Sequence, residues 1–346
     1  MKNKNHIKKA LFDTLHIWQQ EFMRVIRQPG VILIFFVASL LYPIVYGLIY
    51  KNEVVRDIPI AYFDKSHSSL SREYIRALDA TPELIMSYPC ENLDEAKDLF
   101  FRHDVHGIVV IAEDFSDNIR QGKQAFVSGY FDMSSFLYYK NIMSAISFTN
   151  RDFGAELQYA NLANSGITDE AVRATIAPIQ YEGVALFNSG GGFSSFFLPA
   201  LLVLIIYQTL MLGINALAGL DWEENNLRVL LPINSRSRGT LRIVLGKSLC
   251  YFSIYAVLTF YSLGFIPRLF NLPHIGHQWE LFLFFVPFLL ASTFLAMTLS
   301  VAMRSMESAF LLILFSSLPL LFMGGASWPQ SNIPVFWKLF SYFFPS

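Results

Sequence analysis

Residues 31–50 have the sequence VILIFFVASLLYPIVYGLIY, which contains no Asp, Glu, His, Lys or Arg. A helix of roughly 20 apolar residues is long enough to cross the hydrocarbon core of a bilayer. The composition of the whole chain agrees with a membrane location, because 53% of its 346 residues are apolar and only 15% are charged. An ordinary soluble domain carries about 25% charged residues. The stretch therefore predicts a first membrane span.

Four further stretches of this kind follow in the second half of the chain, at about 193–220, 248–267, 281–303 and 308–328. The region between the first two spans, 51–190, is much more polar. The predicted fold class is therefore an all-α transmembrane domain of five spans with an inserted extracytoplasmic α/β domain. Prolines inside the spans each free a backbone carbonyl and predict a kink or a helix start. These prolines are Pro43, Pro199, Pro287 and Pro319.

Lys and Arg residues near the spans predict the orientation, because short cytoplasmic loops carry an excess of them. Twelve lie on the side of the N-terminus, in residues 1–30, in the loop 221–247 and at Arg304. Two lie on the other side, Arg268 and Lys338. We therefore expect the N-terminus in the cytoplasm and residues 51–190 outside, which for a bacterial cell means the inner membrane.

Residues 1–30 are expected to form a separate cytoplasmic element. Apolar residues recur at helical spacing from Ile7 to Ile26, with Lys8, Lys9 and Arg24 largely between them. Such a helix can lie flat at the membrane interface with its apolar face towards lipid. A soluble helix packed on a partner remains the alternative.

The inserted region 51–190 alternates between strand and helix patterns, which predicts a small sheet covered by helices. Long helices are expected from about residue 135 onwards. The predicted strands are 58–64, 83–89, 105–112 and 124–132, and the predicted helices are 69–81, 92–104, 114–121 and about 135–164.

The search for an enzyme site is negative. Gly246-Lys247-Ser248 resembles the end of a phosphate-binding loop, but that loop needs a Gly at position 241, which is Leu241. The pairs His103/His106 and His274/His277 lack further metal ligands nearby. No cofactor or metal is therefore expected in this chain. The net charge of −1 gives no signal for nucleic acid.

The lack of charged residues in the spans also bears on how transport would be powered. Ion-coupled carriers place ionisable side chains at membrane depth, and the five predicted spans have no Asp, Glu, His, Lys or Arg. Energy for transport must then enter elsewhere, and the loop 221–247 is the natural docking surface for a soluble motor subunit. Polar side chains in the spans either join helices or line a pathway. The candidates for a pathway are Tyr46, Tyr207, Gln208 and Asn215.

Several segments, taken in order, resemble the permease subunits of type-two ABC exporters, in the multidrug-type branch that has a large external domain after the first span. Residues 20–29, QEFMRVIRQP, resemble the end of that family's interfacial helix, with Glu21, Arg27 and Pro29 matching. Residues 223–232, EENNLRVLLP, resemble its cytoplasmic coupling region, although Asn225-Asn226 replaces Gly-Thr. Residues 326–346 resemble a re-entrant segment after the fifth span. The family has six spans, so a sixth is expected to follow.

The resemblance implies a function and partners. The chain would be the permease of an ATP-driven exporter that moves an amphipathic or drug-like substrate out of the cytoplasm. ATP and Mg²⁺ would be bound by a separate ABC ATPase subunit. A second permease copy or a paralogue, membrane lipid and a periplasmic adaptor protein are the other implied partners. The residues implied in coupling to the motor are Glu21, Arg27, Glu223, Glu224 and Arg228.

Two other functions remain open at this point. The chain could be a membrane-anchored receptor or assembly factor that uses the external domain as a binding module. Co-purification with a nucleotide-binding subunit separates that function from an exporter. An intramembrane enzyme is disfavoured, because the spans lack ionisable residues at membrane depth.

Overall fold

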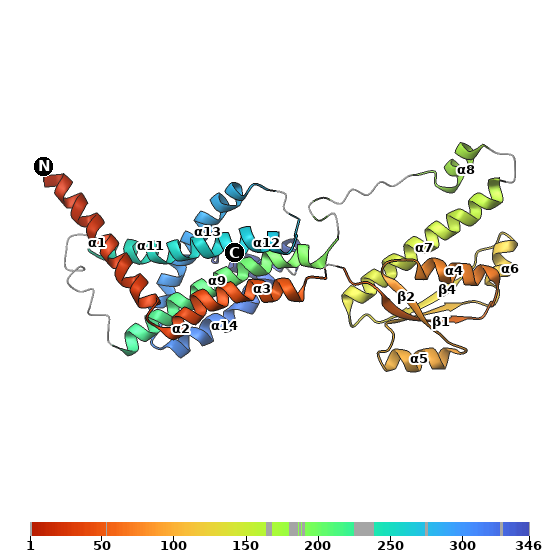
Figure 1. The fold of residues 1–346 in the computed structure, drawn as a ribbon, viewed down its shortest axis with the longest axis horizontal. Helices are drawn as coiled ribbons and strands as arrows, with labels where there is room; N and C mark the ends of the chain where they lie inside the picture. The colour runs from red at the N-terminus through yellow and green to blue at the C-terminus, as the bar shows by residue number, and fades with distance from the viewer. Residues whose placement is uncertain are drawn as a thin grey trace. The chain divides into compact units, whose positions relative to one another are not determined.

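The chain divides into two units, one formed by residues 1–53 with 185–346 and the other by residues 54–184. The structure, a computed structural model, describes residues 2–52, 54–163, 168–179, 186, 188, 191–224, 239–273, 276–325 and 328–345. The first unit is helical and the second contains the sheet (Figure 1).

The helical unit is built from long apolar helices joined by short irregular segments. The first part of the chain forms α1 (Lys2–Val25), α2 (Pro29–Ile32), the π-helix η1 (Leu33–Ala38) and α3 (Ser39–Ile49). The later part forms α9 (Phe193–Glu223), α11 (Gly239–Thr259), the π-helix η3 (Phe260–Phe265), α12 (Ile266–Leu269), α13 (Gln278–Ser300), α14 (Met306–Met323), the 3₁₀ turn η4 (Gln330–Asn332) and α15 (Val335–Ser341).

Five helical stretches in the described residues are long and apolar enough to cross a membrane, which confirms the predicted number. They are Pro29–Ile49, Phe193–Glu223, Gly239–Leu269, Trp279–Ser300 and Met306–Met323. The helices around residues 221–247 are longer than the predicted spans. Asp221 and Glu223 lie in the last turn of α9, and the first turns of α11 contain Arg242 and Lys247. The predicted loop 221–247 is therefore partly helical, and its remaining part, 225–238, lies outside the described residues.

The four prolines lie inside α3, α9, α13 and α14 rather than at their starts. The two π-helices were not predicted. η3 ends just before Pro267, whose missing N–H leaves the Leu263 carbonyl without its usual i+4 donor. Ser39 directly follows η1, and its hydroxyl lies 2.9 Å from the Thr209 hydroxyl on α9. Extra residues in a helical turn are a recognised local response to such interruptions.

α9 lies at the centre of the helical unit and contacts α3, α11, α13 and α14. It is the most buried of the five candidate spans, at 61%, against 28% for the first. Two glycines let neighbouring segments approach it closely. A Cβ at position 213 would lie 2.6 Å from the ring of Phe35 in η1, and one at 219 would lie 2.4 Å from the backbone of Ser305. Small residues at helix crossings are the usual solution in membranes, where van der Waals packing drives association.

The second unit contains a small sheet of four strands, as predicted, and the pairing is mixed. Its strands are β1 (Ile58–Asp64), β2 (Leu84–Pro89), β3 (Gly107–Ile111) and β4 (Val127–Phe131), in the order β2-β1-β3-β4. β1 is parallel to β2 and β3, whereas β4 is antiparallel to β3. The helices are α4 (Ser69–Asp79), α5 (Leu93–Phe101), α6 (Phe115–Arg120), α7 (Phe136–Ala163) and α8 (Asp169–Ile176).

The two faces of this sheet are covered separately. Ile58 and Ile60 of β1 belong to a core shared with α4 and α7, whereas Ala61 packs with α5 in a second, smaller core. This alternation follows from the period of two in a strand. In Figure 1, α5 lies on the opposite side of the sheet from α4 and α7.

We expect the Gly219→Ala substitution to lower the melting temperature of the purified protein in detergent. The added methyl group would meet backbone atoms of Ser305, which cannot rotate away, and such overpacking costs about 1–3 kcal/mol. Gly276→Ala is the matched control in the same unit, because among the described residues its Cβ would have only the Glu280 carboxylate oxygen nearby, at 3.9 Å. Equal melting temperatures for the two variants would contradict the close crossing of α9 and the segment before α14.

Candidate functional site

One face of α1 packs along α11, and this face carries acidic as well as apolar residues. Asp13, Ile17, Glu21 and Val25 recur at every fourth position and are all buried, with exposed fractions of 5% or less. Residues four apart lie on one side of a helix. Gly246 of α11 faces them, and a Cβ there would lie 2.7 Å from the side chain of Ile17. The missing side chain therefore lets the two helices come close enough for their polar groups to pair.

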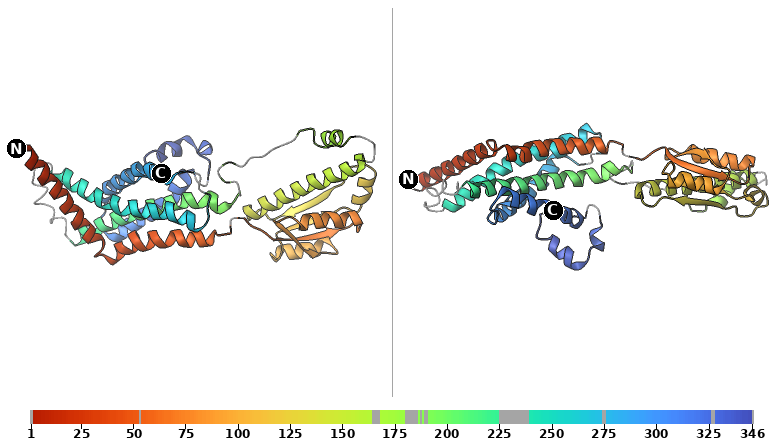
Figure 2. Two further views of the ribbon diagram at one scale, coloured as in Figure 1. Left: turned by 45° about the horizontal axis from the view of Figure 1, so that its top comes forward. Right: turned by 90° about the horizontal axis from the view of Figure 1, so that it is seen from below.

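Two sets of ion pairs join α1 to its neighbours. Asp13 Oδ2 lies 2.7 Å from Arg242 Nη1 of α11. Further along α1, Glu21 Oε1 lies 3.1 Å from Lys247 Nζ and also accepts a hydrogen bond from the hydroxyl of Tyr251. The order of these pairs shows that α1 and α11 run in the same direction, as they do in Figure 2.

Arg24 extends the second set to α9. Its guanidinium lies 3.4 Å from Glu21 Oε2 and forms an ion pair with Asp221 in the last turn of α9. Two carboxylates, Glu21 and Asp221, thus face two cations, Arg24 and Lys247, and the formal charges cancel. We call these four residues the ionic cluster. A buried charge is tolerated when it is paired and hydrogen-bonded, and this set meets both conditions.

The pKa of Glu21 reflects this environment. Burial by itself raises the pKa, because it disfavours the charged carboxylate. The charges of Lys247 and Arg24, together with the Tyr251 hydrogen bond, outweigh burial and bring the pKa below the ordinary value of 4.5. Glu21 is therefore ionised at neutral pH.

Contacts around the ionic cluster reach the ends of further helices. The Gln28 side-chain amide, just before α2, donates to Glu224 Oε1 at 3.4 Å. The guanidinium of Arg304, between α13 and α14, lies 4.9 Å from the ring centroid of Trp222. At this end of the helical unit, therefore, α1 and α9 end and α2, α11 and α14 begin.

The predicted coupling residues occupy different positions around this end. Glu21 is buried within the ionic cluster, so its contacts are with its own chain. Arg27, Glu223 and Glu224 are exposed. Arg228 lies outside the described residues. The structure thus brings Glu21 and Glu224 to one end of the unit, and their role in coupling stays a prediction.

The apolar face predicted for α1 is divided in the structure. Val25 is fully buried, and Trp18 and Phe22 pack partly against the core of the helical unit. Leu11 and Leu15 are exposed, at 60% and 56%. The interfacial placement of this helix stays a prediction. The face that meets the protein also contains Asp13 and Glu21, whose ion pairs make their burial favourable. The exposed residues still form a surface that lipid can cover.

The predicted pathway residues are distributed over α3 and α9. Tyr46 of α3 stacks on Tyr50, with ring centroids 6.4 Å apart. Tyr207 and Asn215 are buried in α9, and Gln208 beside Tyr207 is half-buried. Within the described residues the Tyr207 hydroxyl and the Asn215 Oδ1 have no hydrogen-bond partner. A buried polar atom without a partner is costly. The hydroxyls of Tyr255, Thr259, Ser262 and Ser292 in the same bundle share this condition among the described residues.

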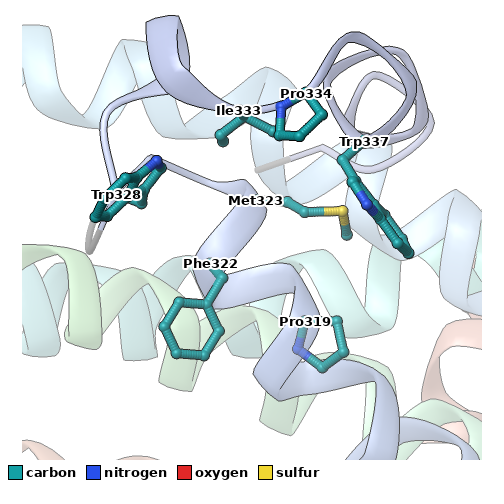
Figure 3. Close-up of a pocket in the computed structure, with 7 residues that line it drawn as sticks. All are labelled: Pro319, Phe322, Met323, Trp328, Ile333, Pro334 and Trp337. Carbon is teal, nitrogen blue, oxygen red and sulfur yellow. The ribbon is translucent and has the colours of Figure 1, made fainter.

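Two apolar cavities lie on either side of the end of α14. One, of about 190 Å³, is lined by residues of α9, α13 and α14, among them Tyr207 and Phe288. The other, of about 350 Å³, is an open pocket lined by α14 and the segment that follows it, which folds back over the helix end (Figure 3). Its lining residues are Pro319, Phe322, Met323, Trp328, Ile333, Pro334 and Trp337. The segment predicted to be re-entrant thus carries the short helix α15 beside α14.

The structure offers no nucleotide site at Gly246-Lys247-Ser248. These residues lie inside the helix α11, where backbone N–H groups are used by the helix. Among the described residues, no group of three or more His, Cys, Asp or Glu side chains could hold a metal ion. His106 stacks on Tyr138, with ring centroids 4.1 Å apart, and His274 lies outside the described residues.

Sequence reasoning missed the pairing of α1 with α9 and α11. Asp13 and Tyr251 were not singled out. Arg24 and Lys247 were considered for orientation, for the N-terminal helix and for a phosphate-binding loop, but not as partners of Glu21. The spacing of Asp13 and Glu21 at multiples of four was a signal that both could lie on one face. Nothing in the sequence indicated which helix that face would meet.

The described helices define the class of this protein as a multi-pass membrane protein with five candidate spans. The model of the ABC-2 family of transporter proteins matches residues 29–346, so the chain belongs to that family. It is the membrane permease component of an ABC-2 type transporter. Permease domains of this family lack a nucleotide-binding site and bind no cofactor, and ATP is handled by an ABC ATPase partner. None of the curated proteins compared with the chain matches it.

We expect Lys247→Met to destabilise the helical unit strongly. The substitution leaves the Glu21 carboxylate buried without its closest cation, and breaking a buried pair costs about 3–5 kcal/mol. The double variant Glu21→Gln/Lys247→Met should recover much of the loss. Thermal unfolding of the purified protein measures both effects. Asp94→Asn, which removes an exposed ion pair with Lys97, is the control and should leave the melting temperature unchanged.

Acid should release α1 from α11. Because the pKa of Glu21 is lowered in the folded protein, the carboxylate contributes stability above its ordinary pKa of 4.5 and loses that contribution as the pH falls through the lower, folded-state value. The protection factors of the α1 amides, which correct for the slower intrinsic exchange in acid, should therefore fall on acidification below about pH 4.5. In Glu21→Gln the fall should be smaller. An equal pH response in both proteins would show that another group controls it.

Proposed function

We propose that this permease works in an ATP-driven exporter that moves an amphipathic or drug-like substrate out of the cytoplasm. The observation that carries the proposal is the ionic cluster, which ties α1 to the two helices that flank residues 225–238. A motor that pushes on this segment or on α1 would move α9 and α11 together with it. Ion pairs between three helices transmit such a movement, because separating paired charges in a buried environment costs much free energy.

The exposed residues at the same end are the proposed contact with the motor. Glu223 and Glu224 extend from the last turn of α9, and Arg27 follows α1. Together with Arg228, these charged residues lie within a few positions of Arg24 or Asp221 in the sequence. The excess of Lys and Arg on this side supports a cytoplasmic location, which is where ATP is available. We place residues 54–184 on the opposite side, in the bacterial case outside the inner membrane.

The proposed substrate class rests on the interior of the bundle. The cavity of about 190 Å³ combines apolar walls with Tyr207, whose hydroxyl has no hydrogen-bond partner among the described residues. An amphipathic molecule could use both kinds of surface. Two permease copies, or this chain and a paralogue, would then form the pathway between them, with Tyr46, Gln208 and Asn215 as its further polar residues. A periplasmic adaptor would meet the α/β unit.

A membrane-anchored receptor is the second function considered, and one observation favours it. The α/β unit has its own two cores and its own cavity, so it has the features of an independent binding module. A receptor would need no joint movement of α1 with α9 and α11, however, whereas the ionic cluster gives a direct route for one.

The test is purification of the protein from its native cells with an affinity tag. An exporter should bring an ABC ATPase with it, and candidate substrates should stimulate the ATPase. The triple variant Glu223→Ala/Glu224→Ala/Arg228→Ala should then lose ATPase binding or show only the basal rate. Asp94→Ala/Lys97→Ala on α5 is the control, because it removes exposed charges from the other unit.

The outcomes separate the two functions. If wild-type protein carries no ATPase that candidate substrates stimulate, the export proposal is wrong. If the triple variant keeps both the ATPase and full stimulation, export stands but these residues are not the contact with the motor.

A further inference from the structure

The α/β unit contains a cavity of about 460 Å³ that the permease function does not use. It lies between α4, α6 with the turn after it, the start of β4, and the second half of α7. Small-molecule sites typically have volumes of about 300–1,000 Å³, so the cavity is large enough for a ligand of its own.

The floor of the cavity is aromatic. Tyr74 of α4 lies between Phe115 and Phe153, with ring centroids 5.8 and 5.5 Å from its own. These three rings are nearly fully buried, and Leu157 of α7 adds a partly buried aliphatic side chain. The Tyr74 hydroxyl donates to Asn150 Oδ1. The floor therefore offers apolar contact to a planar or aliphatic group.

The rim is polar and carries a single charge. Lys123 is the only charged residue among the described residues that line the cavity. Its ammonium group donates to the neutral side chain of Gln121 at 2.8 Å, so this hydrogen bond leaves its charge uncompensated. The amides of Gln124, Asn150 and Gln158 also lie at the cavity. This rim favours an anionic group or a strong hydrogen-bond acceptor.

Gly154 lies in the wall of the same cavity. It lies within α7, a helix of 28 residues, where a glycine is less favourable than alanine. Its conformation does not require glycine, and a Cβ at this position would have no atom of the described residues within 4 Å. No packing contact among the described residues explains the choice. The absence of a side chain does keep the wall of the cavity open, because Gly154 lines it between Phe153 and Leu157.

We propose that this cavity binds a small amphipathic anion. The apolar part of the ligand lies on the aromatic floor of Tyr74, Phe115 and Phe153. Its anionic group lies at Lys123 and the neighbouring amides, and Gly154 leaves room for it. The site is separate from the membrane bundle, so it gives the α/β unit a ligand whether or not the permease exports that ligand.

The test uses the full chain in nanodiscs and naphthalene-2-sulfonate as the probe, with isothermal titration calorimetry as the measurement. The probe joins a planar apolar ring to one negative charge. Wild-type protein should bind it saturably, and naphthylmethylammonium, the matching cation, should bind at least about tenfold more weakly, because a charge-assisted hydrogen bond is worth about a factor of ten.

Three variants complete the experiment. Gly154→Leu should obstruct the cavity beside the aromatic floor and abolish binding without lowering the melting temperature, since leucine favours a helix more than glycine does. Lys123→Gln should weaken the sulfonate about tenfold and remove the preference for the anion over the cation. Lys140→Gln, an exposed lysine on α7 that does not line the cavity, is the matched control and should bind as wild type does.

The proposal is overturned if wild-type protein shows no saturable binding, or if binding survives in both Gly154→Leu and Lys123→Gln. If Gly154→Leu lowers the melting temperature, Lys123→Gln alone decides, through the loss or retention of the anion preference. Failure of the export proposal leaves these results unchanged, because none of them involves an ATPase or transport.

Discussion

The buried pairing of Glu21 with Lys247 and Arg24 is the interaction on which the helical unit depends. A carboxylate with an exposed fraction of 2% is stable only where cations and donors surround it. Lys247, Arg24 and the Tyr251 hydroxyl provide them from α1 and α11, and Asp221 balances Arg24 from α9. The position of α1 follows from this requirement, because moving the helix by one turn would leave several charges buried without partners.

Close approach of backbones makes this pairing geometrically possible. Gly246 lets Ile17 contact α11 directly, and Gly213 and Gly219 do the same for Phe35 and Ser305 around α9. In a bilayer the lipid is as apolar as the helix surface, so tight packing and polar contacts replace the hydrophobic effect between helices. The α/β unit shows the opposite use of glycine, since Gly154 borders open space.

Much of the fold could be predicted from local patterns. The run 31–50 and its four counterparts predicted five spans because apolar length is set by the bilayer. The strands around Ile60 and Val109 were predicted because alternation and β-branched residues are local signals. The π-helices before Ser39 and Ile266 were not predicted, because a shifted hydrogen-bond register depends on neighbouring helices as well as on the chain itself. The candidate coupling residues, such as Glu21 and Glu224, were named through the family resemblance, whereas the candidate pathway residues, such as Tyr207, were named for their polarity within the spans.

The sequence by itself determined the class of the protein, since span length, the polar insert and the charge distribution are properties of the chain alone. The tertiary structure decided which side of α1 faces the protein. Asp13 and Glu21 look like solvent-facing residues until Arg242 and Lys247, more than two hundred positions later, are placed beside them. The same holds for the cavity at Gly154, which exists only where α4, α6 and α7 meet. The physical reason is that burial of a charge, or opening of a cavity, depends on the sum of contacts from distant segments, which no local pattern contains.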